Sequence, residues 1–281
     1  MAYTVSVSDA RSTLLRRTRT GSRGTVTQVA DQTHFLVDGS RADPSGHWDN
    51  GWLRLLPPAS DTTPRRVVSW DYDAHRFTVD PPFGSPPSVG TAYEVSRFLS
   101  FEDALDIMNA ALADYWPLLA PVAWSEVAVP TASFRLTQPA GFADFGVQQI
   151  CLEPIVSQQD APWPPLEGWE YLPDGVTIQL PVHPTLAHRG RKLRLIGIPP
   201  KPVLTEGASI TFLDAQRYEV YLRLCEAELW AFMARFPAEL DVATYLQREQ
   251  LVRAEAYRRL RQLGVALPFE LRPPFRQSRG W

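Results

Sequence analysis

The chain has 281 residues, of which 44% are hydrophobic and 11% aromatic, so it can bury one large core or two to three smaller ones. Its formal net charge of −3 argues against a general binder of nucleic acid or of membrane surfaces, since such proteins need a basic excess. Nearly all of the positive charge is arginine, because Lys192 and Lys201 are the only lysines. Arginine is favoured at protein interfaces, and a GC-rich genome explains the same bias equally well.

The N-terminal sequence lacks the apolar core of a signal peptide, and the chain contains no apolar run long enough to span a membrane. We therefore expect a soluble protein made in the cytoplasm. Cys151 and Cys225 lie far apart in apolar surroundings, with no ligand-like spacing. This pattern predicts two buried free thiols.

Residues 1–22 are polar apart from the pair Leu14–Leu15. They are expected to form either a brief helix or a mobile N-terminal arm.

The following segment, 23–98, has the pattern of a small antiparallel β-module. Short stretches rich in β-branched and aromatic residues alternate with turn residues, which is typical of such a sheet or barrel. The expected strands are 24–29, 34–37, 52–56, 66–70, 76–79 and 92–95.

A helix is predicted within 99–118, joining the helical part of the chain. Ser100 is its expected N-cap, and Glu102 and Asp103 place negative charge in the first turn, where the helix dipole favours it. Pro117 is expected to end the helix. One face is apolar and comprises Ala104, Leu105, Met108, Ala111, Leu112, Tyr115 and Trp116.

A second β-rich module is predicted over 119–202. Its expected strands are 124–129, 133–137, 147–156, 176–180 and 192–196, and a long ordered loop rich in Pro and Trp is expected over 158–173. The two β-modules do not repeat each other in sequence, so no internal duplication is predicted.

The segment 203–264 has the pattern of a long helical hairpin, around which the rest of the chain is organised. Apolar residues recur at helical spacing over 214–236 and, less strictly, over 238–263. Pro237 separates the two helices and Gly264 is the expected C-terminal cap. Each helix would be roughly 35 Å long. Such a hairpin favours an assembly role more than a catalytic one.

The last stretch, 265–281, contains several prolines and has no periodicity, yet it is rich in aromatic residues, unlike most disordered tails. It is expected to form either a strap over the chain's own surface or an extended C-terminal arm that orders against a neighbouring subunit. The residues expected to contact that partner are Phe269, Leu271, Arg272, Phe275, Arg276 and Trp281.

A search for catalytic motifs finds no serine-nucleophile elbow, phosphate loop, dinucleotide fingerprint or zinc-protease helix, so we expect neither an enzyme nor a cofactor. His183 and His188 lack a convincing metal spacing. Asp71 and Asp73 resemble a catalytic acid pair but are more typical of a hairpin turn. The acidic loop 43–51 does not match a calcium-binding loop.

The nine Trp residues allow two interpretations. Exposed indole rings can stack on sugars, and Trp163 and Trp169 are the candidates for such a role. Core packing and subunit interfaces are the commoner explanation and account for most of the tryptophans.

Four arginines near the end of the second helix also allow two interpretations. They could face DNA that passes through a ring, or they could form i,i+4 pairs with Glu249 and Glu255. These arginines are Arg253, Arg258, Arg259 and Arg261.

Two stretches together resemble virion proteins of tailed bacteriophages, in particular neck or head–tail connector (adaptor) proteins. One is the β-module, with segments such as Trp48-Asp-Asn-Gly-Trp-Leu-Arg-Leu; the other is the helix Ala104-Leu-Asp-Ile-Met-Asn-Ala-Ala-Leu-Ala-Asp-Tyr-Trp116. The resemblance covers about residues 21–116. Connector proteins are typically helical bundles with a β insertion, whereas β-structure dominates this chain before the hairpin.

The resemblance implies a structural virion protein that forms a ring of about twelve copies between portal and tail. Its expected partners are copies of itself, the portal protein and tail or neck proteins, with non-specific contact to passing DNA. The virion neck is the expected location. Because the chain is richer in β-structure than the family, a host-surface or glycan-binding role in the tail, baseplate or fibre attachment is the alternative.

Taken together, the sequence predicts an α+β fold: a small antiparallel β-module, a second β-rich module, and a long α-helical hairpin packed with a third helix.

Overall fold

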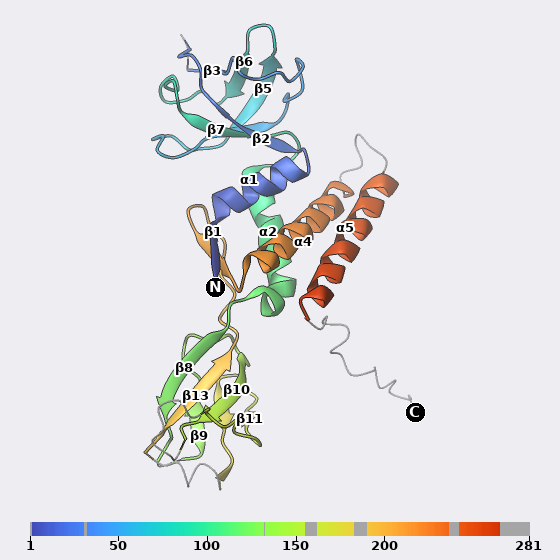
Figure 1. Cartoon of the computed structure of the whole chain (residues 1–281). Helices are drawn as coiled ribbons and strands as arrows, with labels where there is room; N and C mark the ends of the chain where they lie inside the picture. Colours follow the sequence, from blue (N-terminus) through green and yellow to red (C-terminus); the bar gives the residue numbers. More distant parts are fainter. Residues whose placement is uncertain are drawn as a thin grey trace. The chain divides into compact units, whose positions relative to one another are not determined.

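The computed structural model describes residues 2–30, 33–131, 133–154, 162–182, 190–235 and 242–264. It has the predicted α+β class, with helices and antiparallel sheets (Figure 1). The chain divides into two compact units. The larger comprises Val5–Asp114, Leu204–Ile210 and the chain from Glu219 onward, and the smaller comprises Tyr115–Val203 with Thr211–Tyr218 and the residues before Val5.

The N-terminal residues form a strand and a helix. β1 (Tyr3–Ser6) pairs with β14 (Ser209–Phe212), and α1 (Val7–Arg17) follows directly. The Ser6 hydroxyl caps α1 by accepting a hydrogen bond from the Asp9 backbone N–H at 3.0 Å. Four apolar side chains of α1 are buried: Val7, Ala10, Leu14 and Leu15. Of the two expectations for this segment, the structure has the helix.

The predicted β-module is a six-stranded antiparallel sheet with the strand order β2-β7-β4-β5-β6-β3. Its strands are β2 (Gly21–Thr25), β3 (Phe35–Val37), β4 (Trp52–Leu55), β5 (Arg65–Asp71), β6 (Arg76–Asp80) and β7 (Ala92–Ser96). The residues that follow β2 hydrogen-bond to β3 at the opposite edge of the sheet: the Thr27 N–H donates to the Val37 carbonyl at 2.9 Å. This contact closes the sheet into a barrel. Buried residues including Trp70, Phe77 and Tyr93 fill its interior.

A buried ion pair attaches α1 to the barrel. Arg11 is fully buried, and its Nη2 lies 3.0 Å from the carboxylate of Glu94 on β7. Arg54 on β4 pairs with the same carboxylate at 3.4 Å. Removing one member of such a group would leave a buried charge without its partner, so the group fixes the position of α1.

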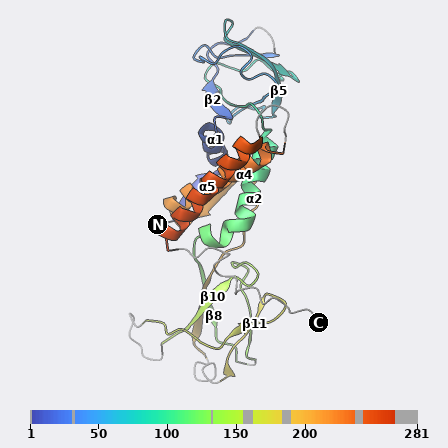
Figure 2. The same cartoon turned by 90° about the vertical axis from the view of Figure 1, so that its right-hand side faces the viewer.

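Three long helices contribute most of their residues to the larger unit. They are α2 (Phe101–Leu119), α4 (Ala215–Met233) and α5 (Val242–Gln262). Helix α4 packs on both α2 and α5. The hydroxyl of Tyr221 on α4 donates to the carbonyl of Met108 on α2 at 3.2 Å. α4 and α5 run antiparallel, because Arg253 pairs with Glu228 at 2.9 Å while Trp230, farther along α4, stacks on Tyr245, near the start of α5, at 5.7 Å (Figures 1 and 2).

The predicted helix boundaries need one correction. Pro117 lies inside α2, which continues to Leu119, so the expectation that it ends the helix is wrong. A proline removes one backbone donor, but the helical hydrogen bonds continue after it, because the Ala120 N–H donates to the Trp116 carbonyl at 2.9 Å. The expected break at Pro237 lies outside the described residues.

The second β-module forms two three-stranded sheets in the smaller unit. The first has the order β10-β13-β8 and the second β11-β12-β9. Their strands are β8 (Ala123–Ala128), β9 (Arg135–Thr137), β10 (Val147–Leu152), β11 (Glu170–Tyr171), β12 (Thr177–Gln179) and β13 (Lys192–Gly197). An apolar core that includes Ile150, Ile178 and Leu193 lies among them.

Candidate interaction surface

The outer face of α5 is a candidate interaction surface. Only Tyr245, Ala256 and Leu260 of this helix are buried. Leu246 and Leu251 keep 45% and 65% of their surface exposed. Leu246 belongs to the apolar residues that recur less strictly in this helix, and it lies off the packed face: the buried residues stand eleven and four positions apart, a spacing that leaves Leu246 one position, or about 100°, away.

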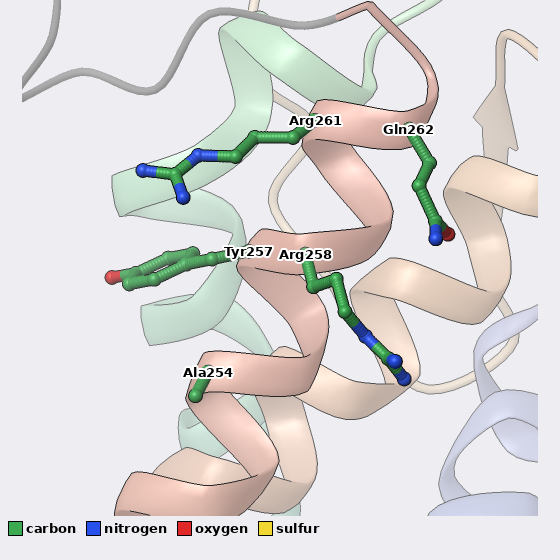
Figure 3. A pocket seen from close by; sticks show the side chains of 5 residues that line it. All are labelled: Ala254, Tyr257, Arg258, Arg261 and Gln262. Carbon is green, nitrogen blue, oxygen red and sulfur yellow. The ribbon is translucent and has the colours of Figure 1, made fainter.

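A shallow hollow of about 460 Å³ lies on the last turns of the same helix. The residues that line it are Ala254, Tyr257, Arg258, Arg261 and Gln262. In Figure 3, the Tyr257 ring and the Arg261 side chain extend to one side of α5, and Arg258 and Gln262 extend to the other. The surface therefore combines one aromatic ring with two guanidinium groups.

Two of the four arginines that were candidates for facing DNA are paired with glutamates. Arg253 pairs with Glu249 one turn earlier and with Glu228 of α4. Arg259 pairs with Glu255 at 2.8 Å. The i,i+4 interpretation is confirmed for these two residues.

The other two arginines of that group, Arg258 and Arg261, border the hollow on α5. Contact between any of the four and DNA stays a prediction.

The expected partner-contacting residues of the C-terminal arm, which are Phe269, Leu271, Arg272, Phe275, Arg276 and Trp281, lie outside the described residues. Their role stays a prediction.

The candidate sugar-stacking tryptophans lie in the smaller unit and have different surroundings. Trp169 packs against the apolar core and meets Tyr171 edge-on at 5.8 Å. Trp163 lies 4.2 Å from the guanidinium of Arg194, which is also 5.8 Å from the ring of Trp124. Trp124 is 66% exposed and was not among the predicted sugar-stacking residues. The alternating pattern of the predicted strand 124–129 could have indicated its exposure, because Trp124 lies on the opposite face from Ser125 and Val127.

The weak catalytic candidates have structural roles or lie outside the described residues. Asp71 accepts hydrogen bonds from the backbone N–H groups of Asp73 and Ala74, at 3.0 and 3.2 Å, which is a turn-forming role. Within the acidic loop 43–51, Asp49 accepts from the Trp70 backbone N–H at 2.7 Å. His183 and His188 are not among the described residues.

Both cysteines are buried free thiols, as predicted. Burial raises the pKa of both thiols, which disfavours the thiolate form that reacts or binds metals. Among the described residues, no three His, Cys, Asp or Glu side chains are grouped so that they could hold a metal ion. No helix in this part of the chain has the length and apolarity needed to cross a membrane.

No family model matches the chain. A comparison of the sequence with curated proteins also finds no match.

Proposed function

We propose that this protein is a structural virion protein of a tailed bacteriophage, a head–tail connector or neck component that assembles as a ring between portal and tail. The outer face of α5 is the observation that carries the proposal. A helix of 21 residues with only three buried side chains presents a long surface on which Leu246 and Leu251 are exposed. The resemblance of residues 21–116 to connector proteins agrees with this role.

A ring needs a heterologous contact, in which one surface of each copy meets a different surface of the next. The α5 face fits the composition of such a contact, because apolar side chains lie among arginines that remain accessible at the rim. Because both leucines are already partly covered, burying the rest of each at the contact would contribute about 1–2 kcal/mol, and this contribution recurs at every interface of the ring.

The test is the mass of the purified protein in solution, measured by light scattering after size exclusion. We expect a species of about twelve times the mass of the single chain. The double variant Leu246→Glu/Leu251→Glu should be a folded monomer, because charged groups cannot be buried at the contact. Val89→Glu, which changes an equally exposed valine in the larger unit outside α5, is the matched control and should still assemble. A monomeric wild-type protein at high concentration would contradict the proposal.

One observation favours the alternative, a host-surface or glycan-binding virion protein. Trp124 and Trp163 both contact the Arg194 guanidinium, which also pairs with Glu126 at 2.7 Å. The exposed Trp124 ring beside charged hydrogen-bonding groups suits the apolar face and hydroxyls of a sugar ring. Glycan-array binding that is lost in Trp124→Ala and kept in Val122→Ala, an exposed neighbour, would favour this role. An array on which the wild-type protein binds no glycan would contradict the glycan-binding role.

A further inference from the structure

A second cavity, of about 260 Å³, lies in the larger unit where the end of α1, the segment after β7 and the α4–α5 pair meet. Its residues come from three regions distant in sequence. They are Thr18, Arg19, Thr20, Arg97, Phe98, Trp230, Met233, Thr244, Tyr245 and Arg248. This volume lies just below the roughly 300–1,000 Å³ of sites that hold drug-sized molecules, so the cavity suits a small group.

The cavity is strongly cationic. Arg19, Arg97 and Arg248 line it, and no aspartate or glutamate is among the described residues that do so. None of the three forms an ion pair within the part of the chain that the structure describes. Three guanidinium groups around one small space repel one another unless an anion lies between them.

Aromatic rings hold two of these guanidinium groups. Arg97 lies over the ring of Phe98 at 4.7 Å, and Arg248 lies over the ring of Trp230 at 4.9 Å. Trp230 itself is buried and stacks on Tyr245. Stacked guanidinium groups lose little freedom when they bind, so their planar donors are already arranged for an anion.

The backbone at Arg19 supplies an independent observation. Its φ is 57°, in the left-handed region that glycine or asparagine usually occupies after a helix. The conformation is held by two hydrogen bonds, from the Arg19 N–H to the Arg16 carbonyl at 3.2 Å and from the Thr20 N–H to the Leu15 carbonyl at 3.0 Å. An arginine at this position is costly for the backbone alone, which points to a role for its side chain.

The segment after β7 is fixed beside this turn. The Arg97 N–H donates to the Thr20 carbonyl at 2.8 Å, and β2 pairs with β7 from Gly21 and Ser96 onward. Arg19 and Arg97 are therefore neighbours through the barrel itself, and α5 brings Arg248 to the same cavity.

We propose that this cavity binds a phosphate group, supplied either by a nucleic-acid backbone or by a free phosphate. Arginine donors match the geometry of phosphate oxygens, and the oxygens of one phosphate group together accept enough hydrogen bonds for three guanidinium groups. The inference goes beyond the connector role, because the cavity lies within one copy of the chain and does not require a ring.

The experiment is isothermal titration of the full chain with inorganic phosphate and, separately, with a short single-stranded oligodeoxynucleotide. Arg97→Gln and Arg248→Gln should each weaken phosphate binding by about tenfold, since each removes one charged hydrogen-bonding partner. Arg16→Gln is the matched control, because Arg16 is an exposed arginine in the last turn of α1 and does not line the cavity. Thermal melting of each variant verifies that it is folded.

Phosphate binding that weakens in both variants and not in the control supports the site. If oligonucleotide binding weakens in parallel, the nucleic-acid backbone is the source; if only free phosphate binds, the source is a small phosphate. The proposal is overturned if the wild-type chain binds neither probe, or if both variants bind as well as the wild type. A competition titration with a glutamate-containing peptide tests the anion: if the peptide binds more tightly than phosphate, the site is not a phosphate site. The mass measurement of the ring is a separate readout, so failure of one proposal does not affect the other.

Discussion

The two helices of the hairpin, α4 and α5, have similar lengths and opposite degrees of burial. In α4, residues such as Val220, Leu222, Leu224 and Cys225 have no more than 1% of their surface exposed. In α5, only three residues are buried and two leucines are exposed. α4 therefore belongs to the core of the larger unit, whereas α5 covers α4 with one narrow face and presents the other outward. Length and amphipathic pattern alone do not reveal this difference.

The difference in burial between the two helices agrees with the positions of the arginines. In α5, arginines and glutamates surround the narrow buried stripe, and Arg253 connects the two helices by pairing with Glu228. A helix with this composition is stabilised by side-chain pairs as well as by burial. Its outer face can then carry leucines for another contact without exposing the core.

The largest expected effect comes from truncating a leucine in α4, and the same truncation in α5 is its comparison. Leu222→Ala in α4 should lower the free energy of unfolding by about 2–5 kcal/mol, because it leaves a cavity in the packed core. Leu251→Ala in α5 should change the free energy by less than about 0.5 kcal/mol in the monomer, since the side chain is already exposed. Urea unfolding monitored by circular dichroism measures both. Equal losses in the two variants would show that α5 is packed as deeply as α4.

A smaller effect is expected at the contact between the helices. Arg253→Ala should cost about 1 kcal/mol, because Arg253 is partly buried and bridges Glu228 and Glu249. A double-mutant cycle with Glu228→Ala isolates the interhelical part of this effect. Arg259→Ala is the matched control, since its pair with Glu255 stays within α5, and it should cost less. A coupling energy of zero between Arg253 and Glu228 would contradict the role assigned to this ion pair.

Much of the fold follows from local patterns in the sequence. The six strands of the barrel, most strands of the second β-module and the helices α2, α4 and α5 overlap their predicted ranges, because alternation and helical spacing are local signals. The exception is β11, which lies in the predicted loop 158–173 and is too short to show a periodic pattern. Burial depth is not local: Leu246 and Leu229 both fit an apolar stripe, yet only Leu229 is buried. The depth depends on how many neighbours cover each helix.

The candidate sites were harder to predict than the elements. Arg253 has the predicted i,i+4 partner, but its pairing with Glu228 depends on how the hairpin closes. The phosphate cavity gathers Arg19, Arg97 and Arg248 from three separate elements, and no spacing in the sequence connects them. The sequence does contain one local sign, because an arginine stands at the end of α1 where a glycine cap is more usual.

The smallest expected effect is a pH dependence on α5. A hydrogen bond from Arg259, at 2.8 Å, lowers the pKa of Glu255 below its usual value, with the nearby positive charges of Arg223, Arg259 and Arg258 acting in the same direction. Because the folded-state pKa is the lower one, this group contributes stability above the pKa of the unfolded chain and loses it as the pH falls through the folded pKa.

Titration of the Glu255 carboxyl group by nuclear magnetic resonance measures the shift directly. In Arg259→Gln the pKa should rise toward its usual value, and the stability difference between variant and wild type should be largest at neutral pH and shrink in acid. Arg248→Gln, on the same helix but without an ion pair to Glu255, should leave the pKa unchanged. An unchanged pKa in Arg259→Gln would mean that the exposed pair is screened by solvent, and α5 would then depend on its narrow buried face and on Arg253 alone.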